Sequence, residues 1–386
     1  MEQANLNKIV EEMNRIGLKK WLLFELTRAY ECARKGKLKT YDEHLFELNW
    51  QENIIKLRNS ILERRYEPGS SVAFVIFEPM VREIFAAPFR DRVVHHFLYN
   101  MQAGWWDKRF IYDSYSCRVG KGTLFGIRRA QKFMRAVSSN GKQKAYVAKL
   151  DIQGYFMSLS REKLYERVKW GLDRQFSPVM DKPMGHQLFK ICDFLWQKVL
   201  YDDPVNKAWK RGPYENWDPE VLPYRKSLYA QPYGRGIVIG NLTSQLVSNI
   251  ILDRLDRFIK YELGYKYYGR YVDDFFIMVP EKEYRDLKIN IPIIEKFLRE
   301  ELGLTLHPNK RYFQEVRKGM SFLGARVYPF VLFPSDRLRA NFEKSVCEVM
   351  KDRREVDSIV SYLGIMYHMD AQKYTHRIFD KVGWRY

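Results

Sequence analysis

Two adjacent acids, Asp273 and Asp274, lie between two runs of β-forming residues. The flanking segments 267–272 and 275–279 are rich in aromatic and β-branched side chains, which predicts a hairpin with the acids at its tip. Neighbouring carboxylates repel each other, and a divalent cation offsets that repulsion because hard cations prefer carboxylate oxygen. An ordinary turn is the alternative, since Asp is common in turns.

A third acid, Asp151, favours the cation. It ends the apolar run 145–150, and the aromatic Phe156 follows five residues later. Asp151 precedes Asp273 by 122 residues (273 − 151), so only tertiary folding can bring them together. Three carboxylates at adjacent strand ends could hold two Mg²⁺ ions about 3.5–4 Å apart, the arrangement that serves in-line phosphoryl transfer.

These two motifs resemble those of reverse transcriptases. Tyr271-Val272-Asp273-Asp274 matches the YxDD box of that family, and the stretch from Asp151 to Phe156 matches its other catalytic box. The resemblance implies an α+β right-hand polymerase. It implies an N-terminal helical segment at 1–65, fingers at 66–145, a palm with inserted finger elements at 146–334, and a helical thumb at 335–386.

Roles for single residues follow from the same resemblance. Asp151, Asp273 and Asp274, helped by the Ile152 carbonyl, would hold two Mg²⁺, with Mn²⁺ as a substitute. Lys310 would protonate the departing pyrophosphate or simply contact phosphate. The expected nucleotide and template contacts are Arg82 over the triphosphate, Phe156 as a steric gate against ribose, Ile239, Gly240 and Gln245 in the nucleotide loop, and Arg118 and Lys121 on the template strand.

Each of these contacts has a structural alternative. Arg82 could be a solvated surface charge, and Phe156 and Ile239 could serve only in packing. Arg118 and Lys121 lie in a glycine-rich turn before a helix, which could bind phosphate or could be a capped turn with surface charges.

The subtype is indicated by the loop at 236–245. Ile239-Gly240 followed by Ser244-Gln245 resembles the IGxxxSQ form of diversity-generating retroelement reverse transcriptases, and the segment 361–368 resembles their thumb. This resemblance implies an error-prone polymerase that copies a template-repeat RNA into cDNA. It also implies a small basic accessory protein that forms a pentameric barrel. Other readings are a retron-like or defence-associated reverse transcriptase and an RNA-binding module without synthesis.

Composition agrees with a polyanionic partner. The 386 residues include 66 Lys and Arg against 47 Asp and Glu, a formal charge of +19. Such an excess suits nucleic acid first and an anionic membrane surface second. The sequence has neither an 18-residue apolar run nor a signal-peptide pattern, so we expect a cytoplasmic protein without membrane association. The four cysteines are widely spaced and predict neither a zinc site nor disulfides.

Hydrophobic periodicity gives a coarse order of elements. Strands alternate with helices without regular βαβ spacing, which favours an α+β fold. The glycine-rich turn at 236–242 leads into a helix, for which Thr243 or Ser244 is the expected N-cap. The expected helices lie within 6–65 and at 91–101, from 123, at 161–170, 185–201, 243–261, 281–302 and 337–386, and the expected strands at 72–77, 145–152, 267–279 and 312–333.

Overall fold

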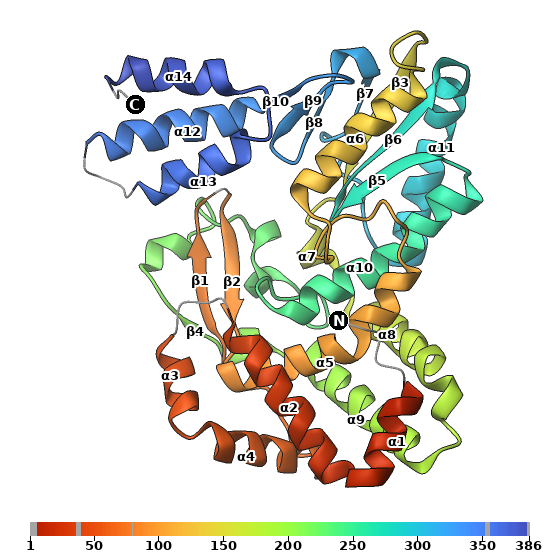
Figure 1. Cartoon of the computed structure of the whole chain (residues 1–386), viewed down its shortest axis with the longest axis vertical. Coiled ribbons are helices and arrows are strands. Elements are labelled where there is room, and N and C mark those ends of the chain that lie inside the picture. Colours follow the sequence, from red (N-terminus) through yellow and green to blue (C-terminus); the bar gives the residue numbers. More distant parts are fainter. Residues whose placement is uncertain (1–5, 36–39, 79, 352–355, 384–386) are drawn as a thin grey trace. The chain divides into compact units, whose positions relative to one another are not determined.

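The computed structural model describes residues 6–35, 40–78, 80–351 and 356–383. The chain forms two compact units that alternate along the sequence (Figure 1). The first unit comprises residues 1–110, 153–255 and 297–305, and the second comprises 111–152, 256–296 and 306–386.

The first unit is mainly helical. Helix α2 packs on α5 and α8 packs on α9, because each presents an apolar stripe such as Trp21, Leu22 and Leu26 on α2. Its helices are α1 (Leu6–Ile16), α2 (Leu18–Arg34), α3 (Tyr41–Leu48), α4 (Trp50–Leu62), α5 (Phe89–Arg109), α7 (Tyr155–Ser158), α8 (Arg161–Phe176), α9 (Pro183–Leu200) and α10 (Leu242–Arg257), whose last two residues belong to the second unit.

A small sheet of the first unit carries Arg82. Its strand order is β2-β1-β4, with β1 (Val72–Ile76) antiparallel to β2 (Arg82–Ala86) and parallel to β4 (Trp209–Lys210). Ala73 and Phe85 pair across the ladder and join Met157 and Leu228 in a small hydrophobic core. One face of the sheet is therefore fixed against the segments that precede α8 and α10.

The second unit is built on a four-stranded antiparallel sheet of order β5-β6-β3-β7. Its strands are β3 (Ala145–Asp151), β5 (Tyr267–Tyr271), β6 (Asp274–Pro280) and β7 (Tyr312–Glu315). Helix α6 (Thr123–Val137) packs against β5 and β6 and covers one face, where Phe133, Val147 and Phe276 share a core (Figure 1). On β3, Tyr146 stacks at 4.0 Å between ring centroids on Tyr284, the first residue of α11 (Tyr284–Phe297).

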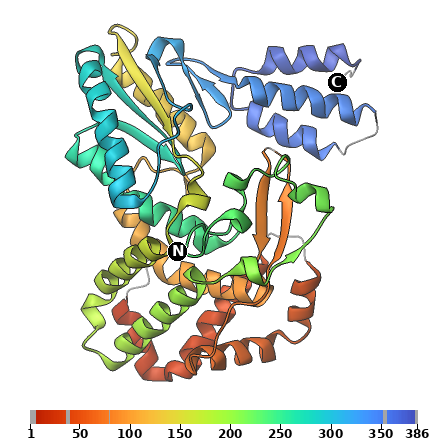
Figure 2. The ribbon, with the colours of Figure 1, turned by 180° about the vertical axis from the view of Figure 1, so that it is seen from behind.

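The C-terminal part of the second unit has a separate three-stranded sheet and three helices (Figure 2). The strand order is β10-β9-β8, and the core of α6 continues through these strands into the helices. These elements are β8 (Met320–Phe322), β9 (Ala325–Val327), β10 (Leu332–Pro334), α12 (Asp336–Val349), α13 (Asp357–Met366) and α14 (Gln372–Lys381).

The predicted mixture of helices and strands is confirmed, with local corrections. Helix α10 begins at Leu242, so Thr243 and Ser244 lie inside its first turn and the predicted N-cap is wrong. Strand β2 was not expected from the sequence. Residues 36–39, 352–355 and 384–386 of the predicted helical segments lie outside the described residues. In the part of the chain that is described, no helix has the length and apolarity that crossing a membrane requires.

Candidate active site

The three predicted acids meet in the four-stranded sheet of the second unit. Asp274 begins β6 and pairs directly with Asp151 at the end of β3, while Asp273 lies in the turn between β5 and β6. The Ile152 N–H donates to the Asp273 carbonyl at 3.2 Å, which ties the turn to the end of β3. The predicted hairpin with acids at its tip is therefore present, and Asp151 lies directly across from it.

Two lysines face these acids. Lys149 Nζ lies 2.7 Å from Asp274 Oδ1, and Lys310 Nζ lies 3.4 Å from Asp151 Oδ1. Lys149 lies on the same strand face as Asp151 because the two are two positions apart and side chains alternate along a strand. Sequence reasoning had selected Lys310 but not Lys149, although an alternation of Lys and Asp at the end of an apolar strand is a usable signal.

The negative charges of the three acids are only partly balanced by nearby positive charges. Burial raises the pKa of Asp273 to about 6, and the nearby Asp151 charge adds to that effect. Burial also raises the pKa of Asp274 to about 6, although Lys149 acts in the opposite direction. Charges that are this poorly solvated favour either a proton or a further cation.

This donor set fits a hard divalent cation by its chemistry, because it consists of carboxylates with too little positive charge around them. Among the described residues, no three acidic, His or Cys side chains converge as a finished metal cage. Binding two Mg²⁺ through Asp151, Asp273 and Asp274 would thus require side-chain adjustment, with the Ile152 carbonyl as a further predicted oxygen donor.

The Asp turn rests on a buried ion pair. Arg270, one residue before the YxDD tyrosine, donates from Nε and Nη2 to the two carboxylate oxygens of Asp256 at 2.6 and 2.7 Å. Both side chains are fully buried, and Tyr268 donates its hydroxyl to the same carboxylate at 2.6 Å. Arg270 Nη1 also donates to the Val272 carbonyl at 3.0 Å. Sequence reasoning missed this support.

Val272 explains why the turn needs such support. Its φ of 54° lies in the left-handed region, which a β-branched residue adopts only when its surroundings enforce it. The bond from Arg270 to the Val272 carbonyl fixes this peptide directly before Asp273. The buried pair therefore positions the Asp273–Asp274 turn.

The predicted nucleotide contacts lie in the first unit. Arg82 begins β2 with an exposed side chain, and Gln245 is exposed on α10. Ile239 is partly buried against the core of Phe85 and Leu228, and its carbonyl accepts from the Phe85 N–H at 3.2 Å. Phe156 is partly buried, and its carbonyl accepts from the Ile237 N–H at 3.0 Å.

The backbone conformation and the close packing at position 240 explain why this residue is a glycine. Its φ is +124°, and a Cβ there would lie 3.2 Å from the Phe85 carbonyl oxygen and 3.3 Å from Ile84 Cγ2. Glycine therefore lets the loop at 236–241 lie directly against β2. The loop is also tied to α5, because the Thr243 hydroxyl lies 2.8 Å from His95 Nδ1. Burial lowers the pKa of His95 to about 3, so the imidazole is neutral.

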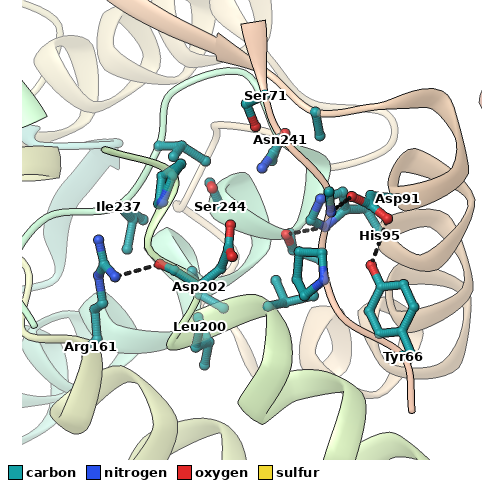
Figure 3. A pocket seen from close by; sticks show the side chains of 18 residues that line it. Tyr66, Ser71, Asp91, His95, Arg161, Leu200, Asp202, Ile237, Asn241 and Ser244 are labelled. Carbon is teal, nitrogen blue, oxygen red and sulfur yellow. Dashed lines mark hydrogen bonds between the residues drawn. The ribbon is translucent and has the colours of Figure 1, made fainter. Parts of the chain in front are cut away.

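A pocket lies beneath this loop in the first unit (Figure 3). Ile237, Asn241 and Ser244 line it from one side, together with Arg161, Asp202, Asp91 and His95. It encloses about 40 Å³, room for only a few water molecules, whereas small-molecule sites occupy roughly 300 Å³ or more. The pocket is thus too small to hold a nucleotide.

Arg118 and Lys121 are engaged within the second unit. Arg118 donates to the Ile111 and Ser114 carbonyls at 2.7 and 3.1 Å, and Lys121 donates to the Tyr112 carbonyl. Lys121 Nζ also lies 4.4 Å from the centre of the Tyr112 ring. Both side chains thus bond to the backbone of their own unit, and the role in template binding stays a prediction.

Solved structures of telomerase are similar to this chain. One is telomerase from Candida albicans in complex with a TWJ fragment of telomeric RNA, with a TM-score of 0.47, 11% identity, and coverage of 88% of this chain and 59% of that one. Another is apo telomerase from Candida tropicalis, with a TM-score of 0.47, 12% identity and coverage of 81% and 59%. The chain spans less than two thirds of these telomerase chains. No curated protein sequence matches it.

A family model gives the stronger comparison. The model described as reverse transcriptase (RNA-dependent DNA polymerase) matches residues 81–327, more than half of the chain. The matched stretch contains Asp151, Asp273, Asp274 and Lys310, and it agrees with the mixed α+β, polymerase-type fold. The boundaries predicted for fingers, palm and thumb stay a prediction. Because this family model matches residues 81–327, the chain belongs to the reverse transcriptase family.

Proposed function

We propose that this chain is an RNA-directed DNA polymerase of the diversity-generating retroelement type, which makes error-prone cDNA from a template-repeat RNA. The observation that carries the catalytic part is the register that pairs Asp151 with Asp274 and leaves Asp273 beside them, in a member of the reverse transcriptase family. Template RNA, a primer and deoxynucleoside triphosphates are the substrates.

Each of the candidate residues would have its own role in the reaction. Asp151, Asp273 and Asp274 would hold two Mg²⁺, which when bound supply the acidity that activates a primer 3′-hydroxyl and the charge that holds a triphosphate. Lys310, 3.4 Å from Asp151, would give a proton to the departing pyrophosphate. Arg82 would contact the triphosphate, since a guanidinium fork binds phosphate through two bonds.

Primer extension on an RNA template tests the catalytic proposal. Wild-type protein should extend a DNA primer with deoxynucleotides in the presence of Mg²⁺, and EDTA should abolish the extension. Binding of RNA with no extension under any priming condition would favour the RNA-binding module instead.

The subtype proposal rests on sequence. It is supported by Ile239-Gly240 with Ser244-Gln245 and by the segment 361–368. A near-duplicate repeat pair beside the gene and cDNA rich in substitutions would support it. Faithful cDNA from a gene without such repeats would favour a retron-like or defence-associated enzyme. The small basic accessory protein is tested by co-purification with the product of a neighbouring gene, and a chain that stays monomeric beside that product would remove this partner.

Phe156→Ala should admit ribonucleotides. An aromatic ring at this position would collide with a ribose 2′-hydroxyl, so its removal should lower discrimination between the two sugars by at least about tenfold. Incorporation of dNTP and rNTP is compared for the variant, wild type and Tyr155→Phe. Tyr155→Phe is the control because it keeps the adjacent ring and removes only the hydroxyl, which donates to the Ser248 carbonyl and accepts from the Ser248 hydroxyl. Unchanged discrimination in Phe156→Ala would assign the ring to packing alone.

Ile239→Gln should lower misincorporation. Isoleucine offers no donor or acceptor to an incoming nucleotide, whereas glutamine could add one hydrogen bond that penalises misaligned pairs, by about tenfold at most. Sequencing of cDNA gives the error rate opposite each template base. Ile239→Leu is the control, since it stays apolar and should keep the wild-type spectrum. Identical spectra for Gln and wild type at retained activity would show that Ile239 only packs.

A further inference from the structure

Glu83 is a buried acid that belongs neither to the Asp turn nor to the predicted nucleotide contacts. It lies on β2 directly after Arg82, and its side chain is fully buried. Its carboxylate accepts the Ser227 hydroxyl at 2.9 Å and the Leu228 N–H at 2.6 Å. Burial raises the pKa of Glu83, so the carboxylate pays an energetic cost that an apolar residue would avoid. A carboxylate with two specific donors instead fixes its partners in one geometry.

The segment that Glu83 holds supports the nucleotide loop. Leu228 Cδ1 lies so close to Gly236 that a Cβ on this glycine would come within 2.4 Å of it. Leu228 also shares the small core with Phe85 and Met157, and Ile239 packs against that core. Glu83 therefore fixes the segment around Leu228, against which the loop at 236–240 packs.

Three predicted nucleotide contacts are attached to these same segments. Ile239 is bonded to β2 through the Phe85 N–H, and Phe156 is bonded to the loop through the Ile237 N–H. Arg82 is the residue next to Glu83, on the opposite face of the strand because side chains alternate. The predicted contacts of the first unit to sugar, base and triphosphate thus depend on one hydrogen-bonded set of segments, which consists of β2, the segment around Leu228 and the loop at 236–240.

We infer that Glu83 is a positioning residue for nucleotide selection, which acts through Ser227 and Leu228 on the loop of Ile239 and on Phe156. The inference rests on the proposed polymerase function. It adds that nucleotide affinity and sugar discrimination depend on a carboxylate that touches no substrate.

Two variants test the inference. Glu83→Gln keeps the side-chain volume but turns an amide NH₂ toward one of the two donors, and Ser227→Ala removes one donor without a change of charge. Either variant should raise the KM for dNTP, by about tenfold for Glu83→Gln, while kcat falls less. Both should also lower the preference for dNTP over rNTP. Affinity for primer–template should stay within about twofold of wild type.

The chain offers a control with the same chemical change. Asp193 on α9 is partly buried, and it accepts the Tyr165 hydroxyl at 2.7 Å and the Gln197 side-chain amide at 3.2 Å. Asp193→Asn makes the same chemical change at a residue that contacts neither the loop at 236–240 nor β2, so it should reduce thermal stability without a shift in KM or sugar preference.

The outcomes are distinguishable. Wild-type protein that fails to extend a primer on RNA overturns the proposed function. Active wild type with unchanged KM and sugar preference in both Glu83→Gln and Ser227→Ala overturns the positioning role. Equal KM shifts in Asp193→Asn would also overturn it, because they would indicate general destabilisation. If Glu83→Gln does not fold, the result for Ser227→Ala decides.

Discussion

Asp273→Asn is expected to lower the rate of primer extension by at least about a thousandfold. The change keeps the shape of the side chain but removes one of three carboxylates that would hold the metal ions. It should leave template binding almost intact, because that binding relies on the positive charge of the chain. The measurement is single-turnover extension on RNA, with binding followed separately by fluorescence anisotropy.

Asp286→Asn provides the control for this variant. Asp286 is an exposed acid in the first turn of α11, so its neutralisation changes the net charge equally without touching the Asp turn. It should extend primers at the wild-type rate. Near wild-type extension by Asp273→Asn would refute the assignment of Asp273 as a metal ligand.

Asp256→Ala should be the most destabilising of these substitutions. Arg270 would keep a buried charge without its partner, which costs about 3–5 kcal/mol of unfolding free energy. The buried Tyr268 hydroxyl would lose its acceptor as well. Urea denaturation should show a lower midpoint, and extension should fall because the Val272 peptide is no longer fixed before Asp273.

A double variant separates stability from positioning. Asp256→Leu combined with Arg270→Met removes both charges, and buried ion pairs can often be replaced by apolar side chains without loss of stability. We expect much of the stability to return while extension stays low, because no side chain then holds the Val272 carbonyl. Recovery of both stability and extension would mean that the pair only stabilises the fold.

The parts of the site that sequence predicted are those with local patterns. The hairpin around Asp273 follows from two β-forming runs, and Asp151 follows from an apolar strand that ends in an acid. The pairing of Asp151 with Asp274 could be expected from the family resemblance but not from either segment alone, since register depends on contacts distant in sequence.

The missed residues are charges that the fold buries. Arg270 and Glu83 each lie in a strand where a charged residue is expected to face water, and both are fully buried. Asp256 lies near the end of an amphipathic helix, among residues that look like a solvated face. Only tertiary structure supplies their partners: Asp256 for Arg270, and Ser227 with Leu228 for Glu83. The N-cap error arose because α10 already begins at Leu242, so its first turn includes both residues that were expected to cap it.

The alternation of the two units along the chain has a consequence for synthesis on the ribosome. The chain passes from one unit to the other five times, at the boundaries after residues 110, 152, 255, 296 and 305. Strand β3 can pair with its neighbours only after β6 and then β7 have been synthesised, and β7 follows more than 160 residues later. Neither unit is complete before residues beyond 300 have been made. An early stop before β7 would leave an edge of β3 unpaired, and exposed strand edges are prone to aggregation.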